Sequence, residues 1–183
     1  IKDYFNKHSF VEANLNSFDN FVSKELQKII NEIGEIIPSV IPPDVQEFKI
    51  RLDKIWVEKP QIIEADGSRR DVYPSEARLR KLTYSAPMYL EVSAHIDGVQ
   101  VENFVSEIGK LPLMVKSKYC HLYGLKRDEL IERGEDPDDP GGYFILNGNE
   151  RVLVMVEDLA SNKMFIDRNT IGPSRYSARI FSE

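Results

Sequence analysis

The sequence predicts an α+β fold: a mixed, mainly antiparallel sheet with one long helix near the N-terminus and several short helices. Residues 15–33 repeat apolar side chains at spacings of three and four, which is typical of a helix with one buried face. Most later apolar stretches alternate with polar residues, as half-buried strands do. Asp-Gly or Asn-Gly pairs follow several of these stretches and favour tight hairpins. The links between strands are too short for parallel crossovers, so antiparallel pairing is expected.

The long helix is the first element in the chain. Gly34 follows its last apolar residue and suits a C-terminal cap. Pro38, Pro42 and Pro43 then predict a connector without regular structure, because proline lacks the amide hydrogen that helices and strands use.

Residues 47–73 predict a β-meander. Apolar and charged residues alternate along this stretch, and Asp66-Gly67 supplies a turn within it. We expect Trp56 to anchor these strands.

A short helix is predicted next, at residues 75–82. Ser75 is expected to cap it, and Glu76 lies in its first turn, where the positive end of the helix dipole favours an anion. Two hairpins are predicted at residues 89–101 and 141–154, and another short helix is predicted at 126–133. The final predicted strands are at 151–157, 164–167 and 175–181.

The composition is that of an ordinary soluble domain. The 183 residues are 42% hydrophobic and 30% charged, which favours one globular unit. A net charge of -6 argues against a general nucleic-acid coat, so any contact with DNA or RNA is expected to be local. The single cysteine, Cys120, and the lack of a signal segment or membrane-spanning run predict a reducing, cytoplasmic location without a membrane.

The most distinctive stretch is residues 141–154, GGYFILNGNERVLV, in which two apolar runs flank a single Asn147-Gly148 pair. Both residues tolerate the positive φ of a type I′ turn, so they are predicted to form the structural turn of a hairpin. This stretch, together with residues 73–87 and 113–120, closely resembles the second-largest, β-like subunit of multisubunit DNA-dependent RNA polymerase in its archaeal form.

The resemblance implies a supporting role in RNA synthesis. It identifies the chain as the N-terminal part of the protrusion, an elongated domain beside the DNA cleft, ending near the insertion of the lobe. The implied partners are the largest and other polymerase subunits, DNA, the RNA–DNA hybrid and an initiation factor resembling transcription factor B. In the family, the aspartates that bind catalytic Mg²⁺ belong to the largest subunit, so no catalytic residue and no cofactor is expected in this chain. A free-standing interaction module of polymerase-like architecture is the alternative.

Arg151 is the leading candidate for proximity to nucleic acid. The resemblance implies this, because residues 147–154 are similar to a bacterial β-subunit strand beside the RNA–DNA hybrid. The alternative is that Arg151 pairs with a neighbouring acid and positions the hairpin, since arginine binds phosphate and carboxylate alike.

Two further groups of basic residues are candidates for the same role. Residues 110–127 include Lys116 and Lys118 and contain no acid, and the interleaved tyrosines suit stacking on bases. The alternative is a solvated loop whose tyrosines pack inward. Arg78 and Arg80 belong to the second group, part of which must be structural because the predicted helix directs them differently.

The acidic turn at residues 135–140 is a candidate magnesium or calcium site, and its Asp136, Asp138 and Asp139 are the candidate centre of a small carboxylate-dependent hydrolase. Its two prolines stiffen the backbone and no glycine lies within it, so no metal is predicted. Cys120 and His121 are adjacent, but zinc needs about four ligands. A phosphate-binding glycine loop is excluded, because Gly141-Gly142 leads into a strand and not into a helix.

Overall fold

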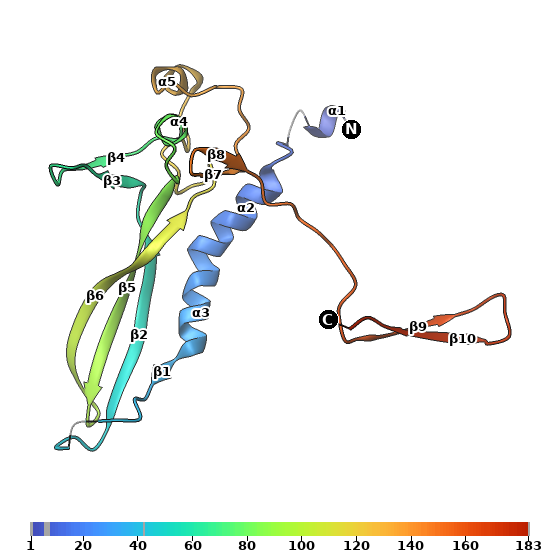
Figure 1. Cartoon of the computed structure of the whole chain (residues 1–183), viewed down its shortest axis with the longest axis horizontal. Helices are drawn as coiled ribbons and strands as arrows, with labels where there is room; N and C mark the ends of the chain where they lie inside the picture. Colours follow the sequence, from blue (N-terminus) through green and yellow to red (C-terminus); the bar gives the residue numbers. More distant parts are fainter. Residues whose placement is uncertain (1, 6–7, 42, 183) are drawn as a thin grey trace. The chain divides into compact units, whose positions relative to one another are not determined.

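The structure, a computed structural model, describes residues 2–5, 8–41 and 43–182 (Figure 1). It divides into two compact units, of which the first ends at Val152 and the second begins at Leu153. The composition favoured a single unit. No helix in the described part of the chain is long and apolar enough to cross a membrane.

The predicted N-terminal helix is present and begins three residues earlier than expected. After the short α1 (Lys2–Phe5), helix α2 (Glu12–Asn20) passes through a π-helical turn, η1 (Phe21–Glu25), into α3 (Leu26–Ile33). Gly34 ends it with φ +66°, which confirms the predicted cap. The connector has no regular element among the described residues from 37 to 47, and Pro42 lies outside the described residues.

The first unit contains a four-stranded antiparallel sheet (Figure 1). Its strand order is β1-β2-β5-β6, and the strands are β1 (Glu35–Ile36), β2 (Phe48–Val57), β5 (Ser85–Ile96) and β6 (Val99–Pro112). Helix α3 packs against β2, where Ile30 meets Leu90 and Val92 in a small core. These pairings confirm the predicted α+β class and the antiparallel sheet.

The predicted meander at residues 47–73 is wrong in its pairing. Strand β3 (Gln61–Ile63) pairs with β4 (Arg69–Asp71) in a separate two-stranded sheet, whereas β2 pairs with β1 and β5. Alternation of apolar and polar residues specifies a strand but does not specify its partner. Trp56 does join two strands, because its ring stacks on Tyr89 of β5 with centroids 5.8 Å apart.

Both short helices of the first unit form, but the expected cap of the first is wrong. Helix α4 (Pro74–Leu79) has Tyr73, not Ser75, as its N-terminal cap residue. Pro74 takes the first helical position, and the amide of Ser75 donates to Oε1 of Glu135 at 2.6 Å. The second short helix, α5 (Arg127–Glu132), is followed by a positive-φ glycine at position 134, as predicted.

The main core gathers beneath the predicted second hairpin, β7 (Phe144–Leu146) and β8 (Asn149–Arg151). Tyr84, Leu113 and Ile145 are fully buried there. The amide of Tyr84 donates to the carbonyl of Ile145, and the amide of Leu113 donates to the carbonyl of Tyr84, both at 2.9 Å. Three segments distant in sequence are thereby held side by side.

The strand predicted at residues 151–157 is wrong beyond Arg151. Residues 152–160 have no regular structure, and their apolar side chains, such as Val154, are exposed. The apolar run favoured a strand, but no strand of the described chain pairs with it. The second unit contains one hairpin, β9 (Met164–Arg168) and β10 (Tyr176–Ile180), which confirms the last two predicted strands.

Candidate nucleic-acid interface

The predicted Asn147-Gly148 turn lies against the end of α4. Its φ values are +51° at Asn147 and +78° at Gly148, as a type I′ turn requires. The amide of Gly148 donates to the carbonyl of Leu82 at 2.9 Å. A Cβ added to Gly148 would lie 2.8 Å from Cα of Lys81 and 3.0 Å from the carbonyl oxygen of Arg78. Glycine is therefore required here both for its φ and for the close approach of two backbones.

The Arg78 cluster, which comprises Arg78, Glu135, Asp139, Tyr143 and Glu150, connects this hairpin to α4 and to the acidic turn. The Arg78 guanidinium donates through Nη1 to Glu135 at 2.9 Å and through Nε to Glu150 at 2.8 Å. Its Nη2 donates to the hydroxyl of Tyr143 at 2.5 Å, and that hydroxyl donates to Asp139. Burial opposes the charge of Arg78, but the bond to Glu135 keeps its pKa above the ordinary value.

A second set of ion pairs joins α4 to the β3–β4 hairpin. Arg80 donates to Glu76 at 2.8 Å and to Glu64 at 3.1 Å, and Arg70 pairs with the same two acids. The hydrogen bond from Arg70 lowers the pKa of Glu76 to about 2. Arg78 and Arg80, both candidates for contact with nucleic acid, thus bind carboxylates within the protein, and their proximity to nucleic acid stays a prediction.

The two lysines of the basic run differ in their surroundings. Lys116 is half-buried, has φ +65°, and donates through its amine to the carbonyl of Asp139. Lys118 is exposed, and its backbone amide donates to Asp19 at 3.0 Å. Within the described residues, no acid pairs with the Lys118 amine.

The interleaved tyrosines also differ. Tyr119 is half-buried and packs against the main core, whereas the Tyr123 side chain is 54% exposed. Tyr119 therefore agrees with the alternative in which the tyrosines pack inward, whereas the ring of Tyr123 is open to solvent.

Arg151 ends β8 and is exposed. Its register partner on β7 is Phe144, and its neighbour Glu150 binds Arg78 instead of Arg151. In the described part of the chain no acid forms an ion pair with Arg151. The alternative in which Arg151 pairs with a neighbouring acid does not occur in this structure.

The acidic turn is held together by its own hydrogen bonds and ion pairs. Asp138 pairs with Arg127 at 2.7 Å, which lowers the pKa of Asp138, and Asp136 accepts the amide of Asp138 at 2.9 Å. Among the described residues, no group of three or more His, Cys, Asp or Glu side chains is placed to hold a metal ion. Glu135 was not singled out from the sequence, because its partners lie about sixty residues away and leave no local signal.

The thiol of Cys120 and the imidazole of His121 have separate surroundings. Cys120 is buried, which raises the pKa of its thiol, and its Sγ accepts the hydroxyl of Tyr84 at 3.4 Å. The Nε2 atom of His121 lies 2.9 Å from the carbonyl oxygen of Pro60. Both residues therefore serve the packing of the main core.

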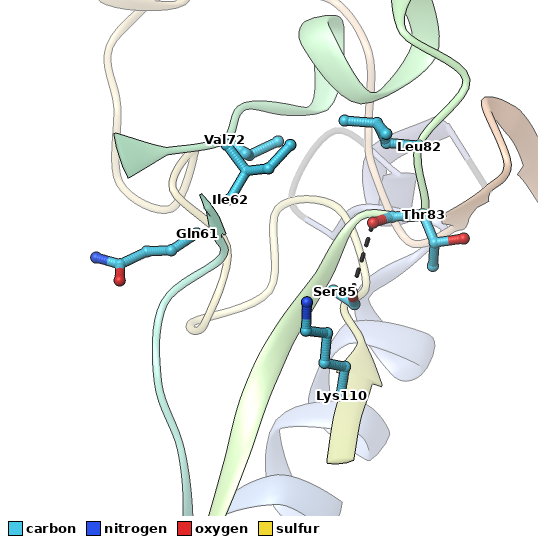
Figure 2. Close-up of a pocket in the computed structure, with 7 residues that line it drawn as sticks. All are labelled: Gln61, Ile62, Val72, Leu82, Thr83, Ser85 and Lys110. Carbon is cyan, nitrogen blue, oxygen red and sulfur yellow. Dashed lines mark hydrogen bonds between the residues drawn. The ribbon is translucent and has the colours of Figure 1, made fainter. Parts of the chain in front are cut away.

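A small cavity adjoins the segment that follows α4 (Figure 2). Lys110 and Ser85 lie at one side of it, and Ile62 and Val72 supply apolar lining. Its volume is about 140 Å³, well below the roughly 300 Å³ at which small-molecule sites begin. This cavity is too small for a nucleotide.

Comparison with known proteins places this chain in a family. The family described as RNA polymerase beta subunit matches residues 9–165, and the chain belongs to that family. Among its relatives, the DNA-directed RNA polymerase subunit Rpo2N of Methanocaldococcus jannaschii is 47% identical over 92% of this chain. Subunit Rpo2 of Saccharolobus solfataricus is 43% identical over the whole chain, and subunit Rpo2N of Halobacterium salinarum is 38% identical. The chain spans 34%, 16% and 36% of the length of these three relatives.

Proposed function

We propose that this chain is the N-terminal, protrusion-type part of the β-like subunit of an archaeal DNA-directed RNA polymerase. In this proposal it forms a non-catalytic wall of the DNA cleft near upstream DNA and the RNA–DNA hybrid. The observation that supports it most is the family match over residues 9–165, together with relatives that are named as subunits of this enzyme.

The distribution of paired and unpaired cations supports a local contact with nucleic acid. Arg78, Arg80 and Lys116 hold the hairpin, α4 and the acidic turn in place. Arg151 and Lys118 are exposed and have no acidic partner in the described chain, so they are free to meet phosphate. Such a contact is compatible with the net charge of -6 because it needs only a few cations on one surface.

The proposed assembly supplies what this chain lacks. The largest subunit would provide the aspartates and Mg²⁺ of the nucleotidyl transfer, in which two metal ions stabilise the attacking and leaving oxygens. The other polymerase subunits and an initiation factor resembling transcription factor B are the remaining proposed partners. A reducing, cytoplasmic location agrees with the buried, unpaired thiol of Cys120.

Association with the other subunits tests the proposal directly. The full-length subunit that contains this chain, carrying an affinity tag, is expected to elute with the largest subunit and to sustain Mg²⁺-dependent RNA synthesis. Elution of the full-length subunit alone, at the size of a single chain, would support the interaction module instead.

Activity of the isolated chain gives a second test. We expect no nucleotide incorporation and no nucleotide hydrolysis by the purified chain, since the described residues include no cluster suited to metal ions. Incorporation that survives removal of trace polymerase with an inhibitor of the complete enzyme would contradict this expectation.

A further inference from the structure

Lys81 occupies a backbone conformation that its side chain does not favour. It follows the C-terminal end of α4 with φ +54°, and the amide of Leu82 donates back to the carbonyl of Ala77 at 2.8 Å. Glycine is the usual residue at this position of a helix end, because a side chain there costs about 1 kcal/mol. We expect an interaction of the Lys81 amine to offset this cost.

Other positive-φ residues of the described chain have evident reasons for their conformation. Asp97, Asn147 and Asn162 are of the residue types that tolerate it. Lys116 uses its amine to bind the carbonyl of Asp139. The hydrogen-bonded end of α4 imposes the φ of Lys81, but within the described residues no bond to the Lys81 amine accompanies it.

The positive charge of Lys81 also remains unpaired in an area rich in acids. Glu76 is bound by Arg80 and Arg70, and Glu150 is bound by Arg78. The arginines that flank Lys81 therefore take the carboxylates, while the Lys81 side chain is exposed.

The backbone beneath Lys81 is held from two sides. Helix α4 precedes it, and Gly148 lies so close that an added Cβ would be 2.8 Å from Cα of Lys81. Arg151 follows Gly148 by three residues of the same strand, which is about 10 Å of extended chain. That distance is about three phosphate-to-phosphate steps along one nucleic-acid strand.

We propose that Lys81 contacts the phosphate backbone of nucleic acid in the assembled polymerase and does so beside Arg151. This inference rests on the proposed function. It adds a residue whose charge the fold leaves free and whose position the hairpin turn fixes. Because the backbone at Lys81 is already fixed, contact with a phosphate would order only the side chain.

Replacement of Lys81 by glycine separates the charge from the fold. Lys81→Gly removes the amine and also relieves the unfavourable φ, so the assembled enzyme is expected to keep or raise its thermal midpoint. Lys81→Asn serves as a second variant, since asparagine tolerates the same conformation. Lys81→Arg retains the charge and is the conservative control.

The measurement is the salt dependence of binding of a DNA–RNA scaffold to the polymerase that carries each variant. The slope of log affinity against log salt concentration is negative. Loss of one phosphate contact reduces its magnitude by about 0.9 for duplex DNA and by about 0.7 for a single strand. We expect this change for Lys81→Gly and Lys81→Asn, with a loss of affinity of about threefold to tenfold near 0.15 M salt. Lys81→Arg is expected to bind as the wild type does, and so is Lys24→Gln, which removes an exposed lysine of η1.

An unchanged slope in both Lys81→Gly and Lys81→Asn, in enzymes of normal thermal midpoint, would overturn the inference. So would loss of another subunit or factor with an unchanged slope, because Lys81 would then meet an acidic protein surface. Failure of the wild-type chain to enter a polymerase would overturn the proposed function itself, and it is seen before any variant is made.

Discussion

Two hairpin turns of the first unit, Asp97-Gly98 and Asn147-Gly148, have similar local chemistry and different surroundings. Asp97-Gly98 joins β5 to β6 with φ values of +47° and +79°, and Asn147-Gly148 joins β7 to β8 with +51° and +78°. A Cβ added to Gly98 would meet nothing within 4 Å, whereas at Gly148 it would lie 2.8 Å from the backbone of α4's end. A turn sequence thus fixes the backbone conformation, but the tertiary contacts decide whether the turn also joins two elements.

The residue before each glycine shows the same difference. The Asp97 carboxylate accepts the amides of Gln46 and Glu47, at 3.0 and 2.8 Å, so this turn holds only the segment that leads into β2. The backbone amide of Asn147 donates to the hydroxyl of Thr83 at 3.1 Å, and Thr83 belongs to the segment that follows α4. The second turn therefore joins the β7–β8 hairpin to the segment that follows α4.

The largest effect is expected where α4, the hairpin and the acidic turn meet. Arg78→Met leaves the Glu135 carboxylate, which is 3% exposed, without its charged partner. We expect the free energy of unfolding to fall by about 3–5 kcal/mol, as when one member of a buried ion pair is removed. Urea denaturation of the chain measures this.

The matched control is Arg80→Met, which removes a 41% exposed arginine from the C-terminal cap of the same helix. Its expected cost is below about 1 kcal/mol. Equal costs for the two variants would show that the Arg78 cluster does not hold the hairpin against α4.

The two turn glycines give the next largest effect. Gly148→Ala adds a methyl group against backbone atoms that cannot move independently, and we expect a loss of about 2–4 kcal/mol. Gly98→Ala meets open space and should cost only the conformational term of about 1 kcal/mol. Thermal denaturation of the pair measures the difference, and similar losses in both would contradict the comparison of the two turns.

The ion pairs between α4 and β4 are expected to give the smallest effect, which depends on pH. The pKa of Glu76 is lowered from 4.5 to about 2 in the folded protein, first through the bond from Arg70. A folded pKa below the unfolded value stabilises the fold above the unfolded pKa, and this stabilisation is lost as the pH falls towards 2.

Glu76→Gln tests this expectation. The variant should be less stable than the wild type at neutral pH, by about 1 kcal/mol. Urea midpoints of the two proteins should converge between pH 4.5 and pH 2, the interval between the two pKa values. A difference that stays constant over that interval would mean that the ion pair is not what Glu76 contributes.

The sequence predicted the elements whose cause is local. The helix from position 15, its glycine cap and both Asn-Gly and Asp-Gly turns depend on residues a few positions apart, and the structure has them. Three predictions were wrong because they depend on partners distant in sequence. They concern the pairing of β2, the capping residue of α4 and the strand expected at residues 152–157. Glu135, for instance, accepts the backbone amide of Ser75 in the first turn of α4, although the two residues are 60 positions apart.

The candidate site shows the same division. A basic residue is visible in the sequence, but whether its charge is free depends on which acids the fold brings near. Arg78 lies 57 positions from Glu135 and binds it, while Arg151 lies next to Glu150 and does not. Only the structure separates the cations that hold the fold from those that remain available.

Photo-crosslinking tests the central claim most directly. A photoreactive amino acid replaces Arg151 in one assembled polymerase and Asp97 in another, and each enzyme is bound to a labelled DNA–RNA scaffold. We expect a crosslink to nucleic acid from position 151 and none from position 97, whose turn contacts the segment that leads into β2. A crosslink from position 97 alone, or none from either position in an active enzyme, would contradict the placement of this surface at the nucleic acid.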